Sequence, residues 1–225
     1  MNGSTSFFTS IILLIILFFI SRLSLQRLFH LLHRYINNNN MIYVGISILL
    51  FPGTIIHELS HAIMAMILQL KIHDIHIFPE WKNGQIKLGS VSYVKKDVFR
   101  SILVGVAPLF VGILALWWLY SLGLYNQASP LQFIFINYIV FVISTTMFSS
   151  KQDMVDIIYA IPIFILIGGI IFVFQIDSSQ ILSLIDVEPI MQFMYAIRTY
   201  LMIAIGIHTA IILFATTILA LHKKP

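Results

Sequence analysis

The sequence predicts an all-α integral membrane protein with about six transmembrane helices and a small cytoplasmic β-hairpin between the second and third helices. Three observations predict this class. Hydrophobic residues make up 59% of the chain and charged residues only 10%, whereas soluble domains carry about 25% charged residues. Long apolar runs alternate with short polar segments, and one polar segment contains an Asn-Gly turn signal. We therefore expect residues 1–225 to form a single polytopic membrane domain.

Apolar runs define the expected helices in chain order, at residues 7–20, 41–70, 101–122, 131–148, 157–174 and 200–221. A membrane span needs about 20 mostly apolar residues, so the first and fourth runs are short. The first run has no basic segment before it and no small-residue cleavage site after it, so we expect a retained helix rather than a signal peptide. Leucines alternate with Arg and His at 21–35, which is typical of a helix end or an interfacial helix.

Lys and Arg between the runs predict orientation. They occur in segment 71–100, at Lys151 and at the C-terminal end, but not in segments 123–130 and 175–189. The first group should therefore face the cytoplasm, in a multi-pass protein of a prokaryotic cytoplasmic membrane. By parity, the arginines at 22–34 would lie outside, against the same rule, so the direction of the first span stays open. A net charge of +4, spread over short clusters, does not predict a nucleic-acid surface.

The second apolar run contains His57, Glu58, Leu59, Ser60 and His61, which form the pattern HExxH. A helix places the two histidines one turn apart on one face, where two imidazoles can bind one metal ion, with a carboxylate beside them to move a proton. With 8 His and 3 Glu in 225 residues, a shuffled chain would contain this pattern with a probability of about 0.004. Ionisable residues within an apolar span are costly without a function, so we predict a metal site inside the membrane.

A catalytic zinc ion generally takes three protein ligands and leaves a fourth position for water. The chain has no cysteine, so the third ligand must be His, Asp or Glu. Glu80 lies in the expected hairpin, and a soluble-side role is expected for it and for the acidic residues of the external loop, namely Asp177, Asp186 and Glu188. Asp97 lies among basic residues, where pairing with a cation explains it. Asp153 and Asp156 remain near the end of the fourth run, and Asp156 could serve as the ligand or orient an imidazole.

Segment 71–94 is no longer a continuous apolar run. Partly alternating apolar residues flank Lys82-Asn83-Gly84, which predicts a β-hairpin. The edge of such a hairpin could hold an extended peptide by strand addition. A solvated hairpin without a binding role explains the pattern equally well.

The run FPGTIIHELSH at 51–61, the hairpin after it, Ala107-Pro108-Leu109 in the next run, and the downstream Asp153 together resemble the site-two protease family of intramembrane zinc metalloproteases. The resemblance covers residues 41–160, which would form a metalloprotease-like core with the hairpin at 71–94 as an insertion. In that family a later span supplies the third ligand from a motif of Asn, spaced prolines and Asp-Gly. Of this motif only the Asp is retained here, and Thr145 stands near the position that the Asn has in the family. The resemblance therefore implies Asp153 as the third ligand.

The expected function is a zinc-dependent, membrane-embedded endopeptidase. Zn²⁺ held by His57, His61 and Asp153 would activate water, and Glu58 would transfer its proton. The substrate would be a membrane-spanning or membrane-associated protein within the lipid bilayer. One alternative is a catalytically inactive, protease-like binding or scaffolding protein. A different HExxH hydrolase, with Glu80 or Glu188 as the third ligand, and a metal transporter are weaker alternatives.

Two other residues in apolar runs carry expectations. Pro52 lies just before the HExxH pattern and should kink or interrupt the second run. His208 lies within the last run, where an ionisable residue is a functional candidate by default. A hydrogen bond from His208 to a neighbouring helix is the simpler interpretation.

Overall fold

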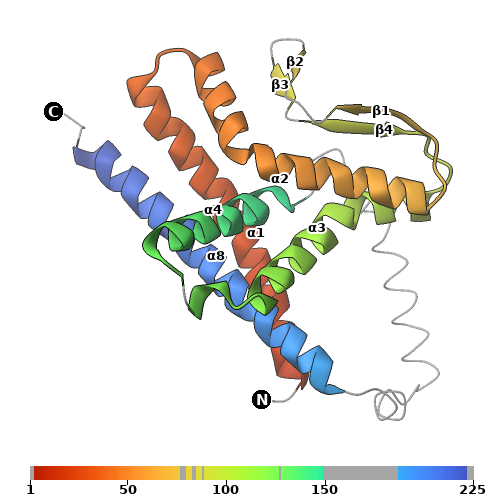
Figure 1. The fold of residues 1–225 in the computed structure, drawn as a ribbon. Coiled ribbons are helices and arrows are strands. Elements are labelled where there is room, and N and C mark those ends of the chain that lie inside the picture. The colour runs from red at the N-terminus through yellow and green to blue at the C-terminus, as the bar shows by residue number, and fades with distance from the viewer. Residues whose placement is uncertain are drawn as a thin grey trace.

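The computed structural model describes residues 3–76, 80–82, 85–87, 89–126, 128–148 and 187–221, which are mostly helical (Figure 1). The main helices are α1 (Gly3–Tyr35), α2 (Asn39–Ile67), α3 (Val98–Ser121), α4 (Pro130–Thr146) and α8 (Val187–Leu221). A short 3-10 helix, η1 (Leu124–Asn126), lies between α3 and α4. Short strands lie between α2 and α3, namely β1 (Ile72–His76), β2 (Glu80–Lys82), β3 (Gln85–Lys87) and β4 (Ser90–Tyr93).

Among the described residues, four helices are long and apolar enough to cross a membrane: α1, α2, α3 and α8. Helix α4 is apolar but has only 17 residues. The chain therefore has the character of a multi-pass membrane protein. The run predicted at 157–174 lies outside the described residues, and the run predicted at 7–20 is part of a helix that continues to Tyr35.

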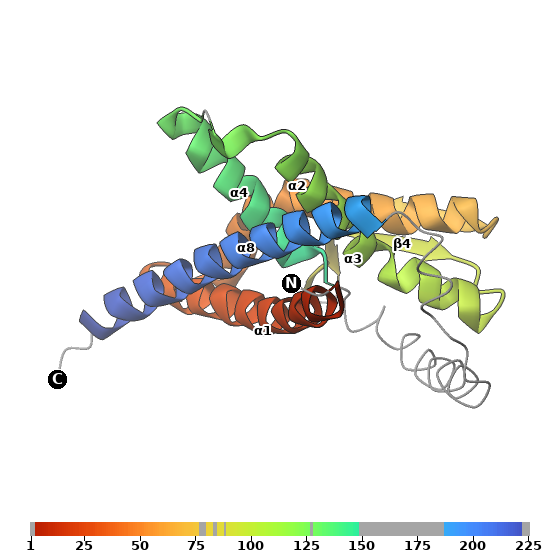
Figure 2. The same cartoon turned by 90° about the horizontal axis from the view of Figure 1, so that it is seen from below.

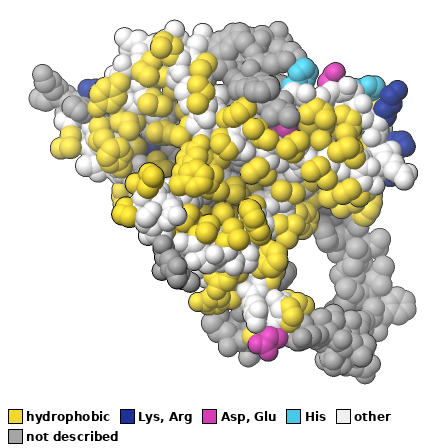
Figure 3. Space-filling view, in the orientation of Figure 1, with side chains coloured by type: hydrophobic (Ala, Val, Ile, Leu, Met, Phe, Trp, Pro, Cys, Tyr) yellow, Lys and Arg dark blue, Asp and Glu magenta, His cyan; other side chains and the backbone are white. Residues whose placement is uncertain are grey.

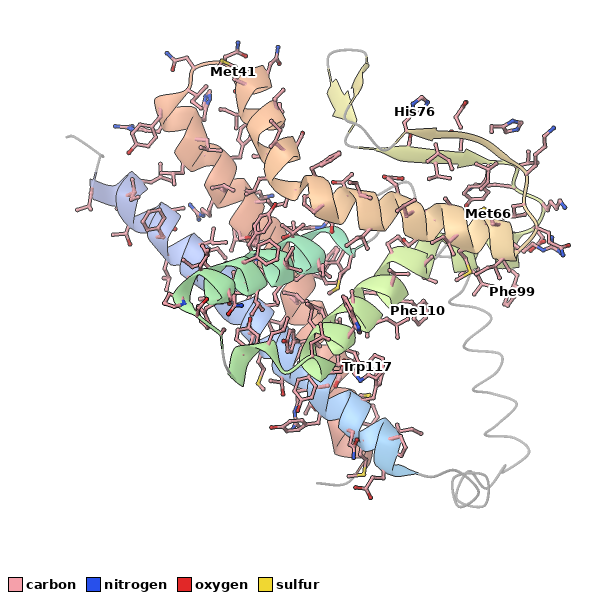
Figure 4. All side chains as sticks on the ribbon, viewed as in Figure 1. Met41, Met66, His76, Phe99, Phe110 and Trp117 are labelled. Carbon is pink, nitrogen blue, oxygen red and sulfur yellow. The ribbon has the colours of Figure 1, made fainter. Side chains whose placement is uncertain are left out.

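Large apolar side chains cover much of the face shown in Figure 3. Phe99, Phe110 and Trp117 of α3 are exposed and point away from the helix (Figure 4). Similar exposed side chains occur along α1 and α8, including Phe19 and Phe214. Soluble monomers rarely expose continuous apolar patches of more than a few hundred Å², so these surfaces suit a lipid bilayer.

Helices α1 and α8 lie side by side along much of their length (Figures 1 and 2). Leu17 of α1, Leu116 of α3, Val140 of α4 and Leu201 of α8 are fully buried in one core. Helix α4 contacts α1, α2, α3 and α8. Residues 140–144 near its C-terminal end are all buried, so this end lies inside the helix assembly.

Helix α2 passes through Pro52 without ending, but it bends strongly between Met41 and Met66, which lie near its two ends (Figure 4). A proline inside a helix removes one backbone hydrogen bond and crowds the preceding turn, which accounts for the bend. The first half of α2 leads away from the end of α1, and the second half runs toward α3 and the strands (Figure 1).

Helix α4 approaches α2 closely at the bend. A β-carbon built on Gly53 would lie 2.5 Å from Val142 Cγ1 and would also collide with the Thr146 hydroxyl. Glycine at this position therefore allows α4 to end against the second half of α2.

Gly53→Ala is expected to lower the free energy of unfolding by about 1–3 kcal/mol, because the added methyl group overpacks the contact with α4. Gly45→Ala is a matched control in the same helix, since no atom lies within 4 Å of a β-carbon there. Alanine is also the better helix former, so the control should be at least as stable as the unaltered protein. Unfolding titrations in detergent compare the two variants, and equal stabilities would contradict the close approach at Gly53.

The strands form two small antiparallel sheets within the segment for which the sequence predicts a hairpin. Strand β1 pairs with β4, with Ile75 opposite Val91, and the register is irregular between Ile72 and Asp74. Strand β2 pairs with β3. Because β2 and β3 lie between β1 and β4 in the chain, one pair is nested within the other. We refer to the whole segment 72–93 as the ribbon.

Asp97 and Arg100 connect the end of α2 to the start of α3. Asp97 accepts a hydrogen bond from the Arg100 backbone N–H at 2.8 Å and caps the N-terminus of α3. The Arg100 side chain lies 3.1 Å from the same carboxylate and also donates to the Leu68 carbonyl at 3.1 Å. Asp97 is therefore the partner of a cation, as the sequence predicts.

Candidate metal centre

His57 and His61 both lie in the second half of α2, and their imidazole rings approach each other. Their Nε2 atoms lie 3.2 Å apart, and their ring planes are inclined by 85°. The separation of four residues accounts for this approach, because it corresponds to slightly more than one helical turn. His61 is buried and His57 is half-buried, so both rings are largely shielded from solvent.

Each imidazole is oriented by a backbone carbonyl of another helix. His57 Nδ1 donates to the Thr146 carbonyl of α4 at 2.6 Å, and His61 Nδ1 donates to the Val104 carbonyl of α3 at 2.8 Å. Because a carbonyl can only accept a hydrogen bond, both Nδ1 atoms carry hydrogen. In the neutral rings the Nε2 lone pairs therefore face each other, which is the tautomer that a metal ligand requires.

The distance between the two Nε2 atoms fits zinc. With zinc–nitrogen bonds of 2.0–2.1 Å and tetrahedral angles, two ligating nitrogens lie about 3.3–3.4 Å apart. The observed separation is 3.2 Å. Two lone pairs at this distance repel each other unless a cation or a proton lies between them. The donor set and its spacing are therefore suitable for a zinc ion.

Glu58 is the buried carboxylate of the site. It follows His57 directly on α2, and only 7% of its surface is exposed. Gly89, just before β4, lies against its side chain. The ribbon and α2 thus enclose a potential proton acceptor next to the histidine pair.

No third ligand completes the pair among the described residues, where no group of three or more His, Asp or Glu residues is placed to hold a metal. Asp153 and Asp156 both lie outside the described part of the chain. Helix α4, however, ends at Thr146, whose carbonyl binds His57. The chain therefore leaves α4 next to the histidine pair, shortly before both aspartates in sequence.

Other polar residues of the helices and of the ribbon lie away from the histidine pair or have partners of their own. Glu188 is in the first turn of α8, which begins before the last apolar run. His76 is on β1, pointing away from α2 (Figure 4). Thr145 donates its hydroxyl to the Phe141 carbonyl at 2.6 Å within α4. His208 is fully buried and hydrogen-bonded to α1 and α4, as its simpler interpretation predicts.

Comparison with known protein families, with curated proteins and with solved structures finds no match for this chain. Its chemistry is therefore inferred from its own residues and from the motif resemblance that they carry.

Three contributors to the site are not apparent from side-chain patterns. The carbonyls of Thr146 and Val104 orient the imidazoles, but any residue type supplies a carbonyl, so no sequence signal marks these positions. Gly89 lies against Glu58. A glycine within a predicted strand segment can indicate close backbone approach, and this signal could have identified it.

Proposed function

We propose that this protein is an intramembrane zinc metalloprotease that hydrolyses a peptide bond of a membrane-spanning or membrane-associated protein. The observation that carries the proposal is the convergence of His57 Nε2 and His61 Nε2 at 3.2 Å, with both Nδ1 atoms bound to carbonyls. A largely shielded histidine pair whose Nε2 lone pairs face each other is arranged to bind a cation. The adjacent buried Glu58 adds a base to that site.

The proposed ligands are His57, His61 and Asp153, with Asp156 as the alternative third ligand. Asp153 follows Thr146 by seven residues, a length of chain that spans at most about 25 Å when fully extended. An aspartate soon after α4 can therefore reach the histidine pair. The resemblance to site-two proteases supports Asp153 over Asp156.

Zinc at this site would supply a Lewis acid that lowers the pKa of water toward 7 and polarises the scissile carbonyl. Glu58 takes the proton of the attacking water and passes it to the leaving amine. The Thr146 and Val104 carbonyls keep both imidazoles in the tautomer whose Nε2 carries the lone pair that a metal needs. Glu58 and His61 are buried, which shields the reacting groups from bulk water.

The proposed substrate approaches through the lipid bilayer, because the helices present apolar surfaces on their outer faces. Each two-stranded sheet of the ribbon has edges at which an extended peptide could add as a further strand. A helical substrate segment would need to unwind there to expose its peptide bonds. We further propose a prokaryotic cytoplasmic membrane as its location, and the distribution of Lys and Arg supports a ribbon on the cytoplasmic side.

Metal analysis of the detergent-purified protein tests the proposal. The unaltered protein is expected to hold about one zinc ion per chain, and His57→Ala and His61→Ala are expected to hold almost none, because each removes a ligand. One of Asp153→Ala and Asp156→Ala should lose zinc in the same way and so identify the third ligand. His73→Ala, an exposed histidine of the ribbon, is the control and should retain zinc.

The metalloprotease proposal fails if the unaltered protein, offered zinc, holds none. If zinc is bound but no peptide is cleaved, the protein is instead a protease-like binding or scaffolding protein. Zinc retained in both histidine variants would place the metal elsewhere.

A further inference from the structure

The backbone between β3 and β4 passes directly against Glu58. A β-carbon built on Gly89 would lie 2.6 Å from Glu58 Cγ, 2.9 Å from its Oε1 and 3.0 Å from its Cδ. Non-bonded carbon atoms are normally separated by about 3.5–4.0 Å, so no side chain fits between this backbone and the carboxylate. The ribbon therefore forms one wall around the Glu58 side chain.

Space, and not backbone conformation, is the reason for glycine at this position. Among the described glycines, only Gly123 has a positive φ, of 59°. Gly89 does not, so alanine can adopt its backbone conformation without strain. A methyl group at position 89 would instead collide with three atoms of one flexible side chain. The expected response is a displacement of the Glu58 carboxylate, not a rearrangement of the fold.

The imidazoles and the carboxylate are held by different parts of the molecule. His57 is held by a carbonyl of α4 and His61 by a carbonyl of α3. Glu58, which extends from the same helix, meets the ribbon at Gly89. A change at position 89 can therefore move the carboxylate while the histidine pair stays in place.

We propose that Gly89 is a positioning residue that fixes the Glu58 carboxylate for proton transfer. This inference rests on the proposed role of Glu58 as the base. A base must lie within about 2.6–3.2 Å of the proton that it takes. Misplacement by about 1 Å can lower a rate by about 100-fold. The ribbon thus holds the base, in addition to any contact that it makes with the substrate.

Gly89→Ala is expected to lower kcat by about 100-fold for cleavage of a fluorescently labelled single-span peptide in detergent micelles. Its KM and its zinc content should match those of the unaltered protein. Gly45→Ala is the matched control on α2, where a β-carbon meets no atom within 4 Å, and it should keep the full kcat. An unchanged kcat in Gly89→Ala would overturn the inference, and so would loss of zinc, because the ribbon would then be holding the ligands.

Thermal unfolding provides a second test, which needs no substrate. Gly89→Ala should lower Tm in the unaltered protein but not in a Glu58→Ala background, because removal of the carboxylate side chain removes the collision. Equal decreases in both backgrounds would overturn the inference. If the decrease in Tm depends on Glu58 but no peptide is hydrolysed, the contact between Gly89 and Glu58 is supported and the proposed protease function fails.

Discussion

Glu58→Gln is expected to retain zinc while peptide hydrolysis falls by about 10²–10⁴-fold, the usual contribution of a general base. Glutamine has nearly the same shape as glutamate, so it fits beside Gly89 as the native side chain does. Its amide cannot take a proton from water at neutral pH. The two imidazoles remain held by the Thr146 and Val104 carbonyls, which the substitution does not touch.

Zinc content and cleavage of the labelled single-span peptide should be measured on the same Glu58→Gln preparation. Glu188→Gln is the control, because Glu188 is an exposed carboxylate in the first turn of α8. This control should keep both zinc and activity. Unchanged turnover in Glu58→Gln would remove Glu58 from its role as the base, whereas loss of zinc would indicate that its carboxylate is needed to build the site.

The histidine pair is the part of the site that sequence predicts best. The spacing of His57 and His61 fixes their relation on any helix, and the apolar residues around them make a helix within a membrane span the natural context. On any helix this spacing brings the two Cβ atoms to about 5–6 Å. The final approach of the Nε2 atoms to 3.2 Å also depends on the ring orientations, which the Thr146 and Val104 carbonyls hold.

The supports of the pair could not be predicted, because they depend on tertiary packing. The ends of α3 and α4 that supply the carbonyls of Val104 and Thr146 are 47 and 89 residues from His57 in sequence. Gly53 of α2 lies close to α4, and Gly112 of α3 lies close to Met147, the residue after α4. A glycine in an apolar helix does not, however, show which residue packs against it. The sequence therefore indicates the histidine ligands but not the backbone carbonyls that orient them.

Helix boundaries show the same division between local and tertiary information. Helix α4 begins where a capping box formed by Ser129 and Gln132 surrounds Pro130, a local signal that agrees with the run predicted at 131–148. Helix α1 instead continues to Tyr35, through a stretch in which arginines interrupt the apolar pattern. Contact with α8 stabilises α1 in a way that hydropathy alone does not show.

His208 joins three helices through its two ring nitrogens. Nδ1 lies 2.7 Å from Ser24 Oγ of α1, and Nε2 lies 3.0 Å from Ser144 Oγ of α4. A neutral imidazole has one donor and one acceptor nitrogen, so one serine accepts a hydrogen bond and the other donates one. Each hydroxyl also lies within hydrogen-bonding distance of a carbonyl in its own helix, so the serine that accepts from His208 can still donate.

His208→Ala is expected to lower the free energy of unfolding by about 2–5 kcal/mol, mainly because it leaves a cavity among α1, α4 and α8. The side chain is fully buried, and the Phe141 ring lies 5.1 Å from it. His208→Phe fills most of the space but removes both hydrogen bonds, which average about 0.6 kcal/mol each between membrane helices. It should therefore cost less than His208→Ala.

Unfolding titrations in detergent separate packing from hydrogen bonding at this position, with His30→Ala on the exposed face of α1 as the control. A His208→Ala protein as stable as the control would show that the three helices do not depend on this residue. Ser144 lies two residues before Thr146, whose carbonyl orients His57. If His208 holds α4 in place, His208→Ala should therefore also weaken zinc binding, whereas a stability loss with unchanged zinc affinity would confine its role to the packing of α1 and α8.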